Sequence, residues 1–337
     1  GKTAFLTSAA AALLARESPR FSLAPLGAGE VPRFDHAAHI AALAADPPRC
    51  PERTNAVSML ALVAQLDQSP FPSRHLRLEL LDYPGEWLLD LPLLTLRFPS
   101  WSEGVLRRLE APDMVAFAKP FLGFVHGLPM RAKADEALAA AGARMYRELL
   151  HDLRIAGFSY LQPGRNLMPA PGPEPPWLGF FPMLGAGPFA TLLANRYDAY
   201  VEAVRRDLAS PLFAEVDRLV VLADVLSALH GGEAAFADTR AALGAAAGAL
   251  RWRFSWADTF SALTEPRLPP RVIGRVAFAA TKADHVADRQ RGNLASLMKN
   301  LAQVPGNGVR IAHFALASVR CTEDFVWTLE GRPVSAV

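Results

Sequence analysis

The chain of 337 residues lacks several features that define common protein classes. It has only two cysteines, Cys50 and Cys321, which cannot build the disulfide framework of a secreted domain, so we expect reduced thiols in a cytoplasmic protein. No apolar run approaches the ~20 residues that a membrane-spanning helix needs. The first residues, GKTAFLT, lack the basic segment and apolar segment of a signal peptide. The sequence therefore predicts a cytoplasmic protein whose contact with a membrane, if any, is indirect.

An excess of charge of either sign is also absent. The 35 Lys and Arg residues nearly balance the 33 Asp and Glu residues, which leaves a net charge of +2. Proteins that bind nucleic acids neutralise phosphates with basic residues in excess, so we expect no nucleic-acid partner. What the chain does have is apolar content of 51%, enough at this length for one large domain or two ordinary ones.

The first three residues carry part of a phosphate-binding motif. Gly1, Lys2 and Thr3 match the end of the Walker A pattern, G-x-x-x-x-G-K-[ST], in which the Lys neutralises phosphates and the Thr hydroxyl binds magnesium. The residues that follow, AFLTSAAAALLAR, predict a helix, and phosphates bind at helix N-termini. The first strand and the first half of the motif are missing from the chain. Taken alone, the tripeptide is better explained as an exposed polar terminus.

A carboxylate and a glycine stand at the end of a predicted strand in the string LLDYPGEWLLDLPLL, residues 80–94. Asp82 follows the strand directly, and Gly85 comes three residues later, before an apolar stretch that is helix-like. An Asp in this position can hold Mg²⁺, and the N–H of the Gly can bind a terminal phosphate. The simpler alternative is an Asp that caps the next helix and a Gly that makes the turn. The motif D-x-x-G is too short to decide between them.

The segment upstream predicts a second strand and a loop. Residues 53–66 have strand-like content, and they precede the strand that ends at Asp82, so we expect an antiparallel pair joined by a turn. In G proteins a loop before such a strand supplies a Thr that meets magnesium and the γ-phosphate. Thr54 stands in that position, after a proline-rich approach that is typical of a mobile loop. The signal is weak, because many loops contain a Thr.

A candidate base-recognition motif lies nearer the C-terminus. Residues 276–280 predict a buried parallel strand, and the sequence T-K-A-D follows it, with Thr281, Lys282 and Asp284. This sequence is a close variant of the N-K-x-D motif of guanine nucleotide-binding proteins. Its Asp accepts two hydrogen bonds from guanine that adenine cannot donate, and its Lys stem lies along the base. A lone T-K-x-D would be better explained by an Asp that caps a helix.

The next predicted strand adds a fourth piece. Residues 309–320 predict a buried strand that ends in Ser318, Val319 and Arg320, where G proteins have a loop whose backbone touches the base. The motifs G-K-T before a helix, and D-x-x-G, T-K-x-D and S-V-R after strands, occur in the order that a G protein requires. The shared order favours a GTPase with Mg²⁺ and guanine nucleotide over separate caps and turns.

Several strings of the chain resemble the YcjX-like family of bacterial P-loop proteins, which are described as stress-associated ATPases or GTPases. The resemblance runs from residue 1 to about residue 325, on GKTAFLTS, DYPGEWLLDLPLL, LQPGR, RLVVLADVLSAL, FAATKADHV and ASVRCTED. It implies an α/β fold, a P-loop NTPase with a G-domain-like sheet and a large, mostly helical insertion, and bound GTP or GDP with Mg²⁺. Together with the motifs it assigns the nucleotide contacts to Gly1, Lys2, Thr3, Thr54, Gly85, Thr281, Lys282, Asp284, Ser318 and Val319. The metal ligands would be Thr3, Thr54 and Asp82.

The distance between the motifs predicts the domain organisation. The segment from Gly85 to Thr281 is far longer than one strand and two helices need. We expect a GTPase-like core from residues 1–99 and 210–337 and a helical insertion from residues 100–209. Within the insertion, residues 161–189 are rich in Pro and Gly, which is typical of a long surface connection, with packing over the nucleotide site as the alternative.

Two residues are candidates for catalysis. Glu86 takes the place where many Ras-like proteins have a Gln that orients the attacking water, and a carboxylate there is repelled by the γ-phosphate, so hydrolysis should be slow. Arg165 is a candidate arginine finger in cis, although a solvated surface arginine is the favoured explanation.

The sequence as a whole predicts a slow, magnesium-dependent GTPase that acts as a nucleotide-dependent switch. The insertion would report the nucleotide state to an unknown protein partner, and the family resemblance suggests a stress response as the setting. Two alternatives stay open: an interaction scaffold with a vestigial site and no catalysis, or an ATPase. The joint presence of Lys2, Thr3 and Asp82 argues against the scaffold, and Asp284 argues against the ATPase.

Overall fold

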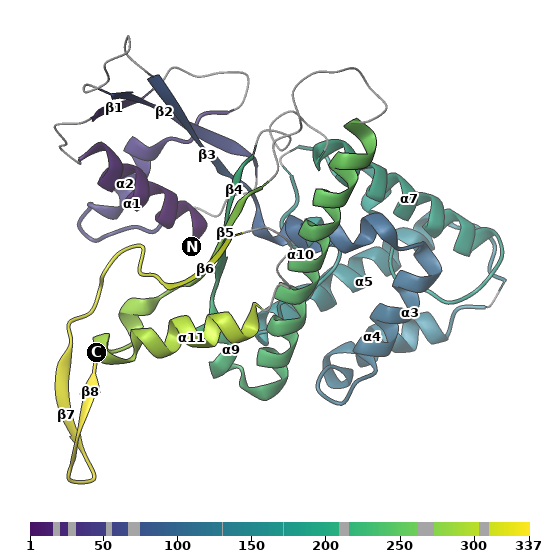
Figure 1. Ribbon diagram of the computed structural model, residues 1–337. Coiled ribbons are helices and arrows are strands. Elements are labelled where there is room, and N and C mark those ends of the chain that lie inside the picture. Colours follow the sequence, from purple (N-terminus) through teal and green to yellow (C-terminus); the bar gives the residue numbers. More distant parts are fainter. Residues whose placement is uncertain are drawn as a thin grey trace.

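The computed structural model describes residues 1–15, 21–25, 32–51, 56–66, 75–129, 131–170, 172–208, 216–261, 273–302 and 310–337. These residues form an antiparallel sheet, a parallel sheet, a C-terminal hairpin and a large group of helices (Figure 1). The helices α3, α4, α5 and α7 gather on one side of the molecule, and the sheets lie on the other (Figure 1). The structure confirms the α/β class that the sequence predicts.

The antiparallel sheet contains the first described strands, in the order β1-β2-β3. The strands are β1 (Phe21–Pro25), β2 (Ser58–Leu66) and β3 (His75–Asp82), and Ser58 lies opposite Asp82. The predicted antiparallel pair is therefore confirmed. Helix α1 (Lys2–Leu14), which is rich in alanine and so has high helix propensity, packs Ala10 into a small core with Leu60 and Leu62. Helix α2 (His36–Leu43) contacts α1.

The parallel sheet has the order β4-β5-β6. Its strands are β4 (Arg218–Ala223), β5 (Arg275–Ala280) and β6 (Arg310–Ala315), connected through α9 (Val225–His230), α10 (Gly232–Ser261) and α11 (Arg291–Leu301). Phe278 of β5 and Met298 of α11 are buried in the same core. The strand predicted at 276–280 is confirmed as buried. The strand predicted at 309–320 is present, but its residues alternate between exposed and half-buried, because β6 is an edge strand of the described sheet.

The helical segment has a core of its own, built largely from aromatic rings. Its elements are α3 (Phe98–Leu109), α4 (Val115–His126), α5 (Glu136–Ile155), α6 (Gly164–Leu167), the short 3₁₀ helix η2 (Pro176–Leu178) and α7 (Pro188–Leu208). The ring of Trp101 lies 5.4 Å from that of Phe180 and 5.2 Å from that of Tyr197. Burial of each large apolar side chain contributes about 1.5–3 kcal/mol, so this cluster accounts for much of the segment's cohesion.

The expectation that residues 161–189 form a surface connection is wrong for about half of their described length. Phe180 and Phe181 are completely buried, and residues 161–168 are buried as well. The hydroxyl of Tyr146 on α5 donates a hydrogen bond to the carbonyl of Gln162 at 2.6 Å. The segment is irregular in backbone, but Phe180 and Phe181 fill space within the core of the helical segment, so this part of it does not lie on the surface.

Helix α10 joins the helical segment to the parallel sheet. Asp238 on α10 is buried and accepts hydrogen bonds from the backbone N–H groups of Ser159 and Tyr160, both at 2.7 Å. The guanidinium of Arg108 on α3 donates to the other oxygen of Asp238 at 2.7 Å. The carboxylate of Asp238 thus holds the residues that follow α5 and the side chain of Arg108, and it fixes α10 to the helical segment.

The chain ends in an exposed hairpin of β7 (Phe325–Leu329) and β8 (Arg332–Ala336), which extends away from the body (Figure 1). Glu330 and Gly331 both have positive φ, 48° and 77°, the geometry of a tight turn that matches strand twist. Within the described residues, no helix combines the length and the apolar content that a membrane crossing requires.

Candidate functional site

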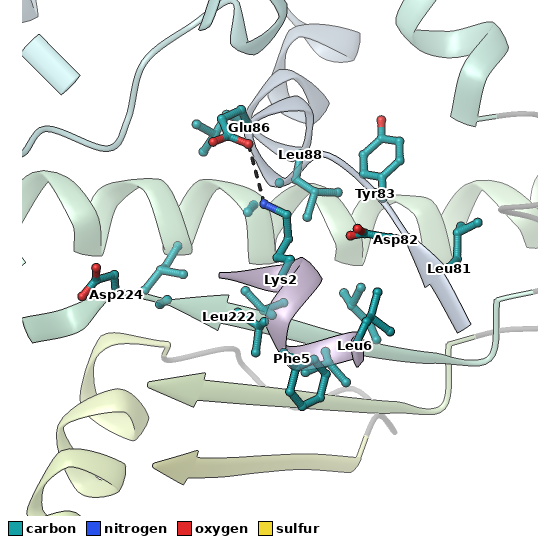
Figure 2. Close-up of a pocket in the computed structure, with 18 of the residues that line it drawn as sticks. Lys2, Phe5, Leu6, Leu81, Asp82, Tyr83, Glu86, Leu88, Leu222 and Asp224 are labelled. Atoms are coloured by element: carbon teal, nitrogen blue, oxygen red, sulfur yellow. Dashed lines mark ion pairs between the residues drawn. The ribbon is translucent and has the colours of Figure 1, made fainter. Parts of the chain in front are cut away.

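A cavity of about 1010 Å³ separates the antiparallel sheet from the parallel sheet. Strands β3 and β4 both line it, and in the described part of the chain β3 pairs only with β2 and β4 only with β5. Among the strands that the structure describes, β3 and β4 each therefore have one edge without a partner strand. Most of the lining is apolar, with leucines from both strands and Phe5 and Leu6 from α1. One end of the cavity has polar residues where the two strands end, with Asp82 and Asp224, and Lys2 lies between these two in the view of Figure 2.

Lys2 and the D-x-x-G segment meet at this polar end. Lys2 is the first residue of α1, and its side chain points at Glu86 (Figure 2), with Nζ 3.7 Å from Oε2. The same ammonium covers Gly85, where an added Cβ would lie 2.9 Å from Nζ. Two motifs that are more than 80 residues apart in the sequence are thus in contact. A larger side chain at Gly85 would therefore push the end of the Lys2 side chain aside.

Asp82 and Thr3 supply buried oxygen atoms near this end. Asp82 is the last residue of β3, is 2% exposed and lines the cavity, and Thr3 is also buried. Asp82 does not cap the next helix: the 3₁₀ helix η1 (Gly85–Thr95) follows Pro84, with no side-chain cap. Carboxylate and hydroxyl oxygens are the ligands that Mg²⁺ takes, and it completes its shell with waters and phosphates. Among the described residues, no group of three or more His, Cys, Asp or Glu side chains is placed to hold a metal ion.

The helix η1 is fixed to the helical segment along its length. The N–H of Gly164 donates to Oδ1 of Asp90 at 2.8 Å, and the indole N–H of Trp87 donates to the carbonyl of Met168 at 2.8 Å. A Cβ on Gly164 would lie 2.0 Å from the carbonyl oxygen of Glu86, so only glycine fits there. The residues after Gly85 therefore cannot shift without moving the segment around Gly164 with them.

Asp90 is a completely buried carboxyl group within this contact. It accepts the hydrogen bond from Gly164 and lies against the hydroxyl of Tyr200 on α7, with the guanidinium of Arg165 nearby. Burial raises the pKa of Asp90 to about 7, although the hydrogen bonds from Tyr200 and Gly164 act in the opposite direction. The group therefore binds a proton far more readily in the folded protein than in an unfolded chain.

Asp90→Asn should stabilise the protein near neutral pH. The folded-state pKa of about 7 lies above the ordinary value of 3.8, so the stability that the wild-type proton contributes is complete below about pH 4 and is lost as the pH rises through 7. Asn keeps an oxygen for Gly164 and never ionises, so we expect a gain on the order of 2 kcal/mol at pH 7.5 and little change at pH 4.5. Thermal unfolding across this range measures it, with the exposed Asp113→Asn as control. Parallel stability curves for wild type and Asp90→Asn would contradict the prediction.

Arg165 does not occupy either position that the sequence suggests. It is 7% exposed, so the expectation of a solvated surface arginine is wrong. Its guanidinium lies 4.6 Å from the ring centre of Trp87 and pairs with Asp207 on α7. Arg165 is also not among the residues that line the cavity. It holds η1 against α7, and its charge is paired with Asp207 rather than directed into the cavity, which is not the position of an arginine finger.

Arg154 is a residue that sequence reasoning missed. It lies in the last turn of α5, and its guanidinium is 2.7 Å from Oε1 of Glu86. Burial raises the pKa of Glu86, but the charge of Lys2, the backbone N–H and the guanidinium of Arg154 outweigh it, so the net pKa lies below the ordinary value. Glu86 is therefore ionised at neutral pH. No local signal in the sequence connects residue 154 with residue 86.

The T-K-A-D sequence follows β5 at the same side of the parallel sheet. The N–H of Thr281 donates to the carbonyl of Ala223 at 2.9 Å, and Lys282 has a left-handed backbone with φ of 60°. The ammonium of Lys282 is 2.7 Å from Oδ2 of Asp224. Asp224 also caps α9, because its carboxylate accepts a hydrogen bond from the N–H of Ser227 at 3.1 Å. Asp224 lines the cavity together with Lys2, so the T-K-A-D sequence adjoins the Lys2 end.

Asp284 contacts the loop after β6 and caps no helix in the described structure. It lies within the 3₁₀ helix η3 (Ala283–His285), which precedes a second one, η4 (Asp288–Gln290), and it is buried. Its Oδ2 accepts a hydrogen bond from the N–H of Cys321 at 3.4 Å. The loop containing Ser318 and Val319 is thereby brought beside T-K-A-D, as the motif order requires.

The structure thus brings together most of the residues that the sequence singled out. One group contains Gly1, Lys2, Thr3, Asp82, Gly85 and Glu86, and the other contains Thr281, Lys282, Asp284, Ser318 and Val319. Arg165 lies apart from both, and Thr54 lies outside the described residues. Asp224 connects the two groups, because it forms an ion pair with Lys282 and lines the cavity together with Lys2.

Comparison with known proteins places this arrangement in a family. A family model described as "YcjX-like family, DUF463" matches residues 1–337. A curated protein of Escherichia coli (strain K12), named Ras-like GTPase YcjX, is 32% identical over 331 residues, which cover 91% of this chain and 70% of the relative. A protein of the same name from Shewanella oneidensis (strain MR-1) is 31% identical over 328 residues, 90% of this chain and 66% of that relative. The chain spans about two thirds of the length of these relatives.

Proposed function

The chain belongs to the YcjX-like family, and from this premise we propose that it binds GTP and GDP and hydrolyses GTP slowly with Mg²⁺. The observation that carries the proposal is the meeting of Lys2, Gly85 and Glu86 at one end of the cavity, beside Asp82 and the T-K-A-D sequence. A cation, a glycine N–H and a buried carboxylate are the groups that a magnesium triphosphate requires. The relatives' name, Ras-like GTPase, supports the same chemistry.

In this proposal the two sheets are halves of one G-domain-like sheet. The cavity between β3 and β4 is lined mostly by leucines and flanked by two unpaired strand edges, which suits a strand leading into Gly1 and pairing with both. Such a strand would end at the polar end of the cavity, where the Walker A loop begins. The core would comprise residues 1–99 and 210–337, and residues 100–209 would be the insertion.

The proposed roles follow from what each side chain can do. Lys2 would neutralise the outer phosphates, with the N–H groups of Gly1 and Gly85 as donors, and Asp284 and Lys282 would hold the guanine base. The other base contacts would come from Thr281, Ser318 and Val319. Thr3 and Asp82, with Thr54, would hold Mg²⁺, which supplies charge neutralisation at the phosphates when it is bound.

Slow hydrolysis follows from the charge of Glu86. Its lowered pKa, which Lys2 and Arg154 cause against the effect of burial, keeps the carboxylate ionised at neutral pH. An ionised group here repels the γ-phosphate and orients an attacking water poorly.

A conformational change at Gly85 would pass through η1 to the helical insertion, which would present the nucleotide state to a protein partner. A role in stress response rests on the family resemblance alone.

Titration of the full-length protein with GTP, GDP and ATP, with and without magnesium, tests the function. We expect guanine nucleotides to bind with Kd values in the micromolar range, and magnesium to strengthen GTP binding. A preference for ATP would favour the ATPase alternative. Absence of binding to any nucleotide would favour a scaffold with a vestigial site.

A further inference from the structure

A second basic residue reaches the Lys2 end of the cavity, and it comes from the helical segment. Arg154 of α5 lines the cavity together with Lys2 and Glu86. Its guanidinium contacts Oε1 of Glu86 at 2.7 Å, and Nζ of Lys2 lies 3.7 Å from Oε2. One carboxylate is therefore shared between two cations, with one cation on each oxygen.

Of the arginines that line the cavity, Arg154 lies at the Lys2 end. Arg77 and Arg218 also line the cavity, but they lie near the starts of β3 and β4, where they pair with Glu79 and Asp217. Asp82 and Asp224, the last residue of β3 and the residue after β4, mark the opposite end, and Lys2 lies between them in the view of Figure 2. The carboxylate that forms an ion pair with Lys2 is that of Glu86, and Arg154 partly neutralises it.

We propose that Glu86 competes with the terminal phosphate for Lys2, and that Arg154 is the positioning residue that sets the strength of this competition. The inference rests on the proposed function, in which Lys2 binds phosphate, and extends it to the control of affinity. Without a triphosphate, Glu86 holds the ammonium. When a γ-phosphate takes Lys2, Glu86 keeps Arg154 as its partner, so the displaced carboxylate is not left unpaired.

The burial of the three groups makes this competition strong enough to measure. The side chains of Lys2, Glu86 and Arg154 are 36%, 19% and 28% exposed, so water screens their charges less than on an open surface. Without Arg154, the full negative charge of Glu86 would face Lys2 and the incoming phosphate. Without the charge of Glu86, no carboxylate would compete with the γ-phosphate for Lys2, and Arg154 would have no negative charge to neutralise.

A double-mutant cycle on the full-length protein tests the proposal. Kd values for GTP and GDP are measured for wild type, Glu86→Gln, Arg154→Ala and the double variant. Glu86→Gln should tighten GTP binding about threefold to fivefold, with a smaller effect on GDP, which lacks the γ-phosphate. Arg154→Ala should weaken GTP binding by a similar factor in the wild type, yet by less than about twofold when Glu86 is already Gln.

The controls separate charge from folding. Arg154→Lys keeps the cation and should restore GTP affinity to within about twofold of wild type, whereas Arg144→Ala removes an exposed arginine from the same helix and should change nothing. Equal effects of Arg154→Ala in both backgrounds would overturn the proposal, because Arg154 would then act without Glu86. If Arg154→Ala does not fold, Glu86→Gln still decides: an unchanged ratio of GTP to GDP affinity overturns the competition. A wild-type protein that binds no guanine nucleotide would instead overturn the proposed function itself.

Discussion

GTP binding should fall about a hundredfold when Lys2 is replaced by alanine. The ammonium of Lys2 would be the one cation of α1 that faces the phosphates, and hydrogen bonds to charged groups are worth about 1.5–3 kcal/mol each. A loss near the upper value corresponds to about a hundredfold in Kd. The loss should be larger for GTP than for GDP, because the outer phosphates carry the contact.

Calorimetric titration of Lys2→Ala against wild type measures this loss. Lys119→Ala, which removes an exposed lysine of α4, is the matched control for the general effect of one charge on an anionic ligand. The variant should melt close to wild type, because Lys2 is partly exposed and its partner Glu86 keeps Arg154. Wild-type affinity in Lys2→Ala would mean that Gly1, Lys2 and Thr3 are not part of a phosphate-binding loop.

Asp284→Asn should change the preferred base from guanine to xanthine. The Asp carboxylate can accept two hydrogen bonds from guanine, whereas one of the two groups of an Asn amide is itself a donor and meets the guanine amine badly. Xanthine has an oxygen where guanine has that amine, so the amide of Asn suits it. Sites built on such hydrogen bonds discriminate by up to ~10⁴-fold, because a mismatched base leaves buried polar groups unpaired.

Competition between GDP and XDP for wild type and for Asp284→Asn measures the change. Asp113→Asn, an exposed Asp on the surface of the helical segment, controls for the loss of one negative charge. Asp284 is buried and accepts a hydrogen bond from the N–H of Cys321, which Asn can still accept through its oxygen, so the fold should hold. No change in preference, or a wild type that prefers adenine, would remove the most specific support for a guanine nucleotide site.

The parts of the fold that the sequence predicts are those set by neighbouring residues. The alanine-rich helix after Gly1, the antiparallel pair that ends at Asp82 and the buried strand before Thr281 all follow from local composition and turn residues. Motif order then indicated which of these elements share a site, and the structure does place Lys2 against Gly85.

The parts that could not be predicted depend on contacts between distant residues. The Pro/Gly-rich segment looks like a surface connection, but Phe180 and Phe181 are buried by helices that are separate in the sequence. Arg165 and Arg154 differ in role only because one meets Asp207 and the other meets Glu86. Nothing within a few positions of either arginine distinguishes a charge buried behind η1 from one at the Lys2 end. Tertiary packing decides the role of each.

The attachment of η1 to the helical segment has a thermodynamic consequence. A nucleotide that shifted Gly85 would also disturb the contact between Asp90 and Gly164, so its binding and the conformation of the helical segment would share one free energy of coupling. Thermodynamic linkage makes that coupling reciprocal. A partner that bound the helical segment would change the affinity for nucleotide by the same factor by which the nucleotide would change the affinity for the partner. A protein with this coupling would be controlled by a partner that promotes nucleotide exchange as readily as by its own rate of hydrolysis. A partner bound to the helices would act on the phosphate site through the same contacts by which the phosphates would act on the helices.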